Sequence, residues 1–155
     1  MLEALARLAP PEPVRSLRQG TRAEALRRAR TCYDHLAGKL GVALMAALLD
    51  RGLLANGAAR GGDPDYRVTA AGLAELRELG IDLGRIPGRR PTVRYCLDWS
   101  EKRHHVAGKL GKALADRFFE LGWLERYESS RAVRITPVGE GALVEVLGLD
   151  LAALT

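Results

Sequence analysis

The sequence predicts an α+β, mostly helical fold that is made of one unit repeated in tandem. The string His-Leu-Ala-Gly-Lys-Leu-Gly at residues 35–41 returns as His-Val-Ala-Gly-Lys-Leu-Gly at residues 105–111. Arg-Val-Thr at residues 67–69 likewise returns as Arg-Ile-Thr at residues 134–136. Because the strings recur in the same order, one supersecondary unit occurs twice along the chain.

The composition is that of a single globular domain, with 155 residues, 47% hydrophobic and 28% charged. A repeat of about 60 residues would be marginal alone, so we expect the two repeats to pack on each other. No apolar stretch approaches the roughly 20 residues that cross a bilayer, so no membrane contact is expected. Two cysteines do not make a disulfide framework, which favours a reducing cytoplasm.

Residues 1–20 predict a short helix and a stiff connector. Leucines at positions 2, 5 and 8 follow a helical spacing, and prolines at positions 10, 11 and 13 end it. A helix this short is not stable alone in water, so it must pack on this domain, a second subunit or a preceding domain.

Residues 21–80 form the first predicted repeat. Thr21 and Glu24 have the spacing of a capping box, which marks the start of a helix. Residues 42–49 contain no polar side chain, so their helix is expected to be buried on nearly every face. Thr69 is expected to cap a third helix. The expected elements are helices over residues 22–36 and 39–51, strands over residues 53–55 and 66–69 around a glycine-rich loop, and a helix over residues 70–79.

Residues 92–155 form the second predicted repeat, after a connection over residues 81–91 that is rich in Gly, Pro and Arg. Asp98 and Glu101 repeat the capping-box spacing. Pro137 stands at the first position of the last helix, where its missing N–H costs nothing. The expected elements are a helix that begins at Asp98, an amphipathic helix over residues 106–121, strands over residues 123–127 and 132–136, and a helix to about residue 147.

Each repeat is thus predicted as helix, helix, β-hairpin, helix, which is the layout of a winged helix. Winged helices commonly bind nucleic acid, but the fold alone does not establish that function. Residues 42–49 offer no Arg, Asn, Gln or Ser to a DNA base, and the matching helix of the second repeat offers only a few charged residues. We therefore do not expect this chain to recognise a DNA sequence directly.

A net charge of +5, with 20 arginines among 24 basic residues, suits contact with phosphate groups. A guanidinium group binds phosphate oxygens through two parallel N–H bonds. The alternative, which we favour, is that these arginines are solvated or paired with carboxylates. The candidates for phosphate contact are Arg27, Arg28, Arg30, Arg89, Arg90, Arg126, Arg131 and Arg134.

Cysteine and histidine recur at similar places in the two repeats, as Cys32 with His35 and Cys96 with His105. On the predicted helix, Cys32 and His35 would lie one turn apart on one face. These four residues could hold a tetrahedral zinc ion that joins the repeats or senses a metal. The interpretation we favour is that the cysteines are small buried hydrophobic residues and the histidines bond to backbone or carboxylate groups. A redox switch between the cysteines is a third interpretation, and no other cofactor is expected.

Aromatic and acidic residues give weaker signals. Tyr33, Trp99 and Trp123 could line a small-molecule pocket between the repeats, although such residues more often belong to the core. Asp34 and Asp98 could act as an acid–base pair, but neither a nucleophile nor a phosphate-binding loop accompanies them. An enzyme is therefore not expected.

Three strings of this chain are specific when they are taken together. They are Cys-Tyr-Asp-His-Leu-Ala-Gly at residues 32–38, Cys-Leu-Asp-Trp-Ser-Glu at residues 96–101, and Leu-Gly-Trp-Leu at residues 121–124 with Arg-Ile-Thr-Pro at residues 134–137. They resemble the C-terminal region of ArsR-like helix-turn-helix transcriptional regulators. The resemblance covers about residues 20–145, and residues 2–18 resemble the connector that follows the DNA-binding domain of such regulators.

The resemblance implies a regulator whose DNA-binding domain precedes the connector. This chain begins at the connector and has no counterpart of that domain's Cys-x-Cys metal-sensing motif. We therefore expect the chain to be the effector-sensing and dimerisation region of a cytoplasmic, homodimeric regulator that responds to a small molecule or a metal. Two alternatives stay open, which are direct contact with DNA phosphates through the arginine-rich hairpins and metal sensing through a zinc site.

Overall fold

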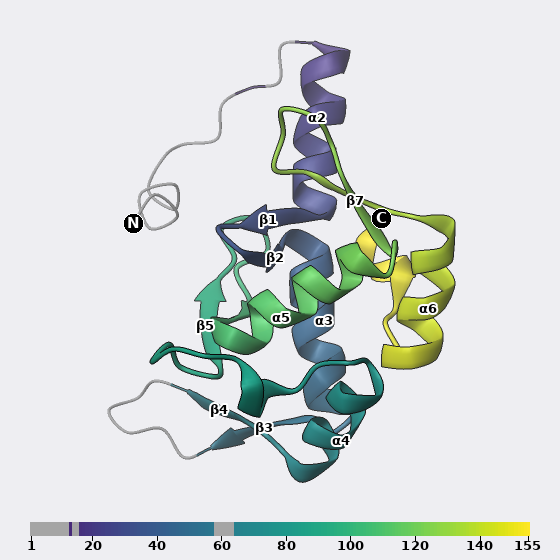
Figure 1. The fold of residues 1–155 in the computed structure, drawn as a ribbon. Helices are drawn as coiled ribbons and strands as arrows, with labels where there is room; N and C mark the ends of the chain where they lie inside the picture. Colours follow the sequence, from purple (N-terminus) through teal and green to yellow (C-terminus); the bar gives the residue numbers. More distant parts are fainter. Residues whose placement is uncertain (1–12, 14–15, 58–63) are drawn as a thin grey trace.

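Each repeat follows the order hairpin, helix, hairpin, helix (Figure 1). The structure is a computed structural model that describes residue 13 and residues 16–57 and 64–155. It confirms the predicted α+β class with tandem winged-helix-like repeats. After α2 (Leu17–Arg28), the first repeat contains β1 (Arg30–Cys32), β2 (His35–Ala37), α3 (Gly38–Asp50), β3 (Leu54–Gly57), β4 (Asp65–Val68) and α4 (Ala70–Glu78). The second contains β5 (Arg94–Leu97), β6 (His104–Ala107), α5 (Gly108–Glu120), β7 (Leu124–Arg126), β8 (Val133–Ile135) and α6 (Pro137–Leu147), and the short helices are η1 (Leu83–Arg85) and η2 (Leu151–Leu154).

The second half of each repeat is a hairpin followed by a helix, as the sequence predicts. β3 pairs with β4 and β7 pairs with β8, both antiparallel. The hydroxyl of Thr69 accepts a hydrogen bond from the N–H of Gly72, and that of Thr136 accepts one from the N–H of Gly139, each at 3.0 Å. These two bonds start α4 and α6. The first confirms the predicted cap at Thr69, and the second agrees with the predicted start of the last helix at Pro137. The helix expected over residues 1–8 and most of the glycine-rich loop lie outside the described residues.

The first predicted helix begins earlier and ends earlier than expected. α2 starts after Ser16, whose hydroxyl accepts a hydrogen bond from the N–H of Gln19 at 3.2 Å. Thr21 is not the cap, because its hydroxyl donates to the carbonyl of Leu17 inside the helix at 2.9 Å. The capping-box interpretation of Thr21 was therefore wrong.

Residues 30–37 form a hairpin and not the end of that helix. β1 and β2 pair in antiparallel register, and Tyr33 in the tight turn between them has a φ of 60°. β1 is also hydrogen-bonded to the hairpin of β7 and β8, here called the second wing, because the N–H of Thr31 donates to the carbonyl of Arg131 at 2.9 Å. Hydrogen bonds to a distant part of the chain thus override a local pattern that is compatible with a helix.

The helix expected to begin at Asp98 is a turn between β5 and β6. The carboxylate of Asp98 accepts hydrogen bonds from the N–H groups of Ser100 and Glu101 at 3.0 and 3.1 Å. An Asp residue makes the same local bonds in a turn and at a helix start, so the sequence pattern does not separate the two. Both repeats therefore open with a hairpin.

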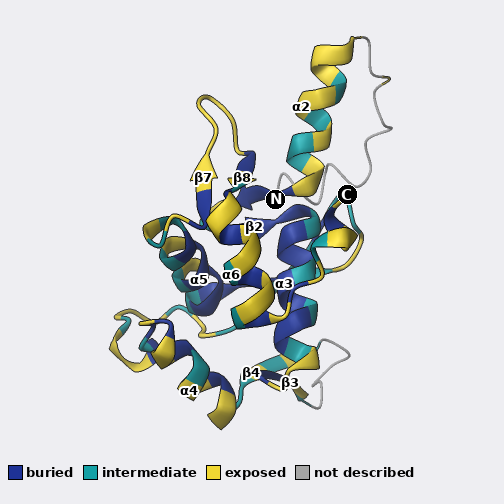
Figure 2. Ribbon diagram, turned by 90° about the vertical axis from the view of Figure 1, so that its right-hand side faces the viewer, coloured by how far each residue is buried: buried dark blue, intermediate teal, exposed yellow. Residues whose placement is uncertain are grey.

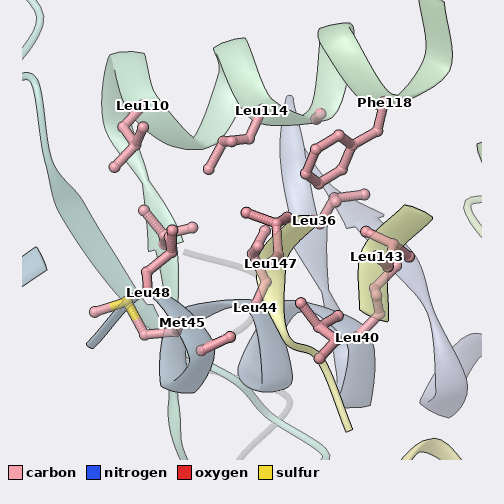
Figure 3. Packing of buried hydrophobic residues seen from close by; sticks show 14 of the residues in the cluster. Leu36, Leu40, Leu44, Met45, Leu48, Leu110, Leu114, Phe118, Leu143 and Leu147 are labelled. Atoms are coloured by element: carbon pink, nitrogen blue, oxygen red, sulfur yellow. The ribbon is translucent and has the colours of Figure 1, made fainter. Parts of the chain in front are cut away.

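The core lies between α3 and α5, which belong to different repeats. Figure 3 shows side chains of α5 pointing toward those of α3, and residues of α6 close the same cluster. Burial of one such side chain contributes roughly 1.5–3 kcal/mol. The labelled members include Leu40, Leu44, Met45 and Leu48 of α3, Leu110, Leu114 and Phe118 of α5, and Leu143 and Leu147 of α6.

The two repeats also exchange contacts around this core, since α3 packs against β6 and α5 packs against β2. This confirms the expectation that the repeats pack on each other. Figure 2 shows that α3 is mostly buried, whereas α2 projects from the body and is largely exposed. Among the described residues, no helix combines the length and the apolarity that a membrane span requires.

Candidate metal site between the two repeats

The opening hairpins of the two repeats bring together the four Cys and His residues that the sequence singles out. Cys32 stands directly opposite His35 in the β1–β2 register, and Cys96 stands opposite His105 in the β5–β6 register. One potential ligand atom of each residue lies within 4.8 Å of those of the other three. Both pairs are therefore cross-strand neighbours, and Cys32 and His35 are not, as expected, neighbours on a helix face.

The cluster is enclosed by protein. Cys32, His35 and His105 are buried, and Cys96 is partly buried. The two histidine rings meet across the repeat boundary, with Nε2 of His35 3.1 Å from Nε2 of His105. Both cysteines are free thiols in the structure.

A carboxylate faces the outer nitrogen of each histidine ring. Nδ1 of His105 lies 3.0 Å from Oδ2 of Asp98, and Nδ1 of His35 lies 3.3 Å from Oδ1 of Asp34. An ionised carboxylate only accepts hydrogen bonds, so each Nδ1 carries the donated proton. In a neutral ring this leaves the lone pair on Nε2, which points into the cluster.

Asp98 is the more deeply buried of the two carboxylates, with a side chain that is 0% exposed. Nη2 of Arg30 donates to both of its oxygens at 2.9 and 3.0 Å, and the N–H of Gly38 donates to Oδ2 at 2.7 Å. Burial by itself would raise the pKa of Asp98, but the bonds from His105 and Gly38 and the charge of Arg30 hold that pKa well below its usual range. Asp98 is therefore a fixed negative charge beside His105.

Asp34 repeats this arrangement closer to the surface. Its carboxylate pairs with Arg90, whose Nη2 lies 3.0 Å from Oδ1. The hydrogen bond from Arg90 lowers the pKa of Asp34, while partial burial opposes the shift. Each histidine of the cluster therefore contacts a carboxylate on its outer side, and that carboxylate contacts an arginine.

The Cys96 sulfur lies in surroundings that favour the thiolate. Hydrogen bonds with Cys32, His105 and His35 lower the pKa of Cys96 far below its usual range. Burial would lower the pKa of His105, but its bonds to Asp98 and Cys96 raise it. The thiolate is the form of cysteine that binds metals and reacts as a nucleophile, so the cluster has the chemistry of a cation site.

The repeated glycines explain how the helices approach this cluster. A Cβ atom on Gly41 would lie 3.3 Å from Cβ of His105, and one on Gly111 would lie 3.1 Å from Cβ of His35. The start of each central helix therefore lies against the histidine of the other repeat. The duplicated His-x-Ala-Gly-Lys-Leu-Gly string supplies both halves of this reciprocal contact.

The eight arginines proposed for phosphate contact do not form one group. Arg30 is 1% exposed and bound to Asp98, so it cannot reach a phosphate group and is instead paired with a carboxylate, as the favoured alternative expects. Arg90 pairs with Asp34, and Arg134 pairs with Glu125. The exposed members are Arg27 and Arg28 on α2, Arg89 in the connection, and Arg126, Arg131 and Arg134 at the second wing, which lies beside α2 (Figure 2).

The three aromatic residues expected to line one pocket are separated. Tyr33 is 89% exposed at a hairpin turn, and Trp123 is buried against Phe118 with ring centroids 5.1 Å apart. Trp99 lies under the guanidinium of Arg30, 4.3 Å from the ring centroid. These three residues therefore do not share a pocket, because Trp99 covers the ion pair and Trp123 belongs to the core, as such residues more often do.

The role of Asp34 and Asp98 differs from the acid–base pair or helix cap that the sequence suggests, because each holds a histidine of the cluster. Each follows a cysteine in a repeated Cys-x-Asp string. That string was the available signal for a pair of equivalent carboxylates. The structure also contains a cavity of about 310 Å³ that the sequence does not indicate, lined by Val42, Met45, Ala46, Leu49, Tyr66, Leu97, Lys102, Arg103 and His104.

Comparison with known proteins finds a bacterial relative. The chain is 39% identical over 152 residues to a Bacillus subtilis (strain 168) protein that bears the name "Uncharacterized HTH-type transcriptional regulator YdfF". The aligned part makes up 97% of this chain and 65% of that protein. This chain thus spans slightly less than two thirds of the relative's length. No family model and no solved structure matches the sequence.

Proposed function

We propose that this chain is the effector-sensing and dimerisation region of an HTH-type, ArsR-like transcriptional regulator. The observation that carries the proposal is the 39% identity, over 97% of the chain, to a protein named as an uncharacterized HTH-type transcriptional regulator. About a third of that relative lies outside the alignment. In this proposal the DNA-binding domain belongs to that additional part of the regulator.

The burial of α3 and the contacts of α5 support a DNA-binding domain outside this chain. α3, at the position of a first recognition helix, is largely buried. The cations of α5 are engaged within the protein, since Nζ of Lys109 donates to the carbonyls of Ile86 and Gly88, and Nζ of Lys112 donates to Asp116. Arg117 donates to the carbonyl of Leu79. A helix in this condition offers few groups to base edges.

The cavity of about 310 Å³ supports the sensing role. One wall is apolar and comes from α3, with Val42, Met45 and Leu49, whereas Lys102 and Arg103 supply positive charge from the β5–β6 turn. Small-molecule sites typically combine such an apolar wall with a few polar groups. The effector that fits this description is a small, largely apolar molecule with an anionic group.

An exposed apolar strip on α6 supports dimerisation. Val138 is 67% exposed and Val144 is 45% exposed, and Gly141 lies between them on the same face. A Cβ atom on Gly141 would meet nothing within 4 Å, so a second helix could approach closely. We propose that a second copy of the chain packs on this strip.

Light scattering after size exclusion tests whether the chain is a dimer in solution. A fusion protein tests the regulatory role: the chain is joined to a DNA-binding domain that represses a reporter gene only when the domain is dimeric. We expect a dimer in solution and restored repression, and loss of both in the variant with Val138→Lys and Val144→Lys. Leu73→Lys is the matched control, because Leu73 is an exposed apolar residue on α4, away from the strip. A monomer that fails to restore repression would refute the dimerisation role.

A second candidate function is direct contact with DNA phosphates, which is favoured by the exposed arginines of α2 and the adjacent second wing. Binding of this kind weakens steeply with salt and depends little on sequence. Fluorescence anisotropy with duplexes of unrelated sequence measures both properties. Tight, salt-sensitive binding that is lost on Arg27→Gln with Arg28→Gln would favour this candidate over the first.

A further inference from the structure

We propose that Cys32, His35, Cys96 and His105 bind one Zn²⁺ ion that clamps the two repeats together. Two donors come from each repeat, and their potential ligand atoms lie within 4.8 Å of one another. Zn–S bonds of about 2.3 Å and Zn–N bonds of about 2.0–2.1 Å place tetrahedral ligand atoms roughly 3.3–3.8 Å apart. Small side-chain adjustments would therefore bring the four donors into coordination. This inference does not depend on the proposed regulatory function.

The two histidine rings supply a specific reason for a cation at this point. Their Nε2 atoms face each other at 3.1 Å, and each Nδ1 is held by a carboxylate. Two nitrogen lone pairs at that separation repel unless a proton or a cation lies between them. A zinc ion accepts both lone pairs, and tetrahedral coordination would hold the two nitrogens at nearly their present separation.

The groups outside the four donors match what a metal site needs. A histidine that binds a metal usually donates its other ring N–H to a carboxylate, which fixes the ring and strengthens the ligand. Asp34 does this for His35, and Asp98 does it for His105. Arg90 and Arg30 in turn hold the two carboxylates. Both halves of the site therefore have the same three layers of donor, carboxylate and guanidinium.

The donor set selects zinc and a closed site. Two thiolates and two imidazoles in a tetrahedron are typical of structural Zn²⁺. An iron–sulfur cluster with two histidines would place its Cys pair and its His pair on different irons. Here all four donor atoms lie close enough to share one ion. Four protein ligands fill the tetrahedron, so the ion would join the repeats and would not activate a water molecule.

The test begins with the metal content of the unmodified 155-residue chain, purified without chelators or a histidine tag. Mass spectrometry of the elements and native mass spectrometry should find one Zn²⁺ per chain. Refolding of the reduced protein with Co²⁺ should give thiolate-to-cobalt charge-transfer absorption and the visible bands of tetrahedral cobalt. Metal at well below one equivalent, together with no cobalt spectrum, would refute the proposal.

Variants then locate the ion. Cys32→Ser and His105→Gln should each lose zinc, and Cys32→Ser should also weaken the charge-transfer band. His104→Gln is the matched control, since His104 is adjacent in sequence but bonds to Tyr66 outside the cluster. Zinc that stays bound in the first two variants would overturn the assignment. If those variants do not fold, a chelator competition on the unmodified chain decides, because release of zinc together with two newly titratable thiols supports the site and release without them refutes it.

Discussion

Arg30 of the first repeat and Asp98 of the second form an ion pair that is closed off from solvent. Nη2 of Arg30 lies 2.9 and 3.0 Å from the two carboxylate oxygens, and the two side chains are 1% and 0% exposed. The same carboxylate accepts a hydrogen bond from Nδ1 of His105 and another from the N–H of Gly38, the first residue of α3. One buried contact thus connects both repeats, the start of a central helix and the metal-site histidine.

Loss of this pair should destabilise the fold much more than loss of its surface counterpart. Arg30→Met leaves the Asp98 carboxylate buried without its main partner, which typically costs about 3–5 kcal/mol. Arg90→Met is the matched control, because Arg90 and Asp34 are 37% and 19% exposed and such pairs are worth up to about 1 kcal/mol. Urea unfolding measures both changes. Equal losses of unfolding free energy would contradict the role assigned to Arg30.

A side chain at either repeated glycine should strain the start of its helix and crowd the histidine of the other repeat. A Cβ atom on Gly41 or Gly111 would lie 2.5 Å from a backbone carbonyl oxygen of its own repeat and within 3.3 Å of the opposite histidine. We expect Gly41→Ala and Gly111→Ala each to cost about 1–3 kcal/mol of unfolding free energy. Gly141→Ala on α6 should instead stabilise the isolated protomer by up to about 1 kcal/mol, because no atom of the same chain lies within 4 Å of that Cβ position. Calorimetric melting temperatures that change alike in all three variants would argue against close contact.

Removal of the proposed zinc should lower the melting temperature of the chain. An ion that binds only the folded state adds about 4 kcal/mol when its free concentration is a thousand times its dissociation constant. Thiolates and neutral imidazoles must be free of protons to bind metal, so zinc affinity falls as the pH falls. Calorimetry with and without chelator should therefore show a large difference at neutral pH and a smaller one at mildly acidic pH. An unchanged melting temperature in chelator at neutral pH would speak against a stabilising ion.

Tyr66 should contribute to stability below its titration range and lose that contribution in alkali. Its hydroxyl lies 2.9 Å from Nδ1 of His104, a bond worth about 0.5–1.5 kcal/mol. Burial, and then the charge of Tyr95, raise the pKa of Tyr66 in the folded state. The folded state therefore holds this proton more tightly, and the stability it adds is complete below the unfolded pKa of about 10 and is lost as the pH rises through the folded pKa.

Tyr66→Phe should accordingly lower the unfolding free energy at neutral pH and flatten its decline above about pH 10. Tyr127→Phe is the control, because Tyr127 is 45% exposed on the second wing. Urea titrations across the alkaline range give both slopes. A decline as steep in Tyr66→Phe as in the parent chain would show that another group causes it.

The wings and the helices that follow them were predictable because their signals are local. Thr69 and Thr136 each cap the helix that follows by accepting a hydrogen bond from the N–H three residues ahead, and the leucines of α5 follow a helical spacing. The opening hairpins were not predictable in the same way. β1 has three residues and depends on hydrogen bonds to the second wing, such as that from Thr31 to Arg131, a partner that no short sequence window contains.

The sequence by itself determined that one unit occurs twice and that each copy carries a cysteine, a histidine and a glycine at matching places. It also determined the apolar stripes that force the two copies to bury each other. Only the tertiary structure decided that the four donors converge, that Arg30 is an internal partner of Asp98, and that Tyr33, Trp99 and Trp123 are apart. The physical reason is that α3 packs on the β6 hairpin and α5 on the β2 hairpin. This exchange sets distances between residues far apart in sequence, and periodicity along the chain carries no information about them.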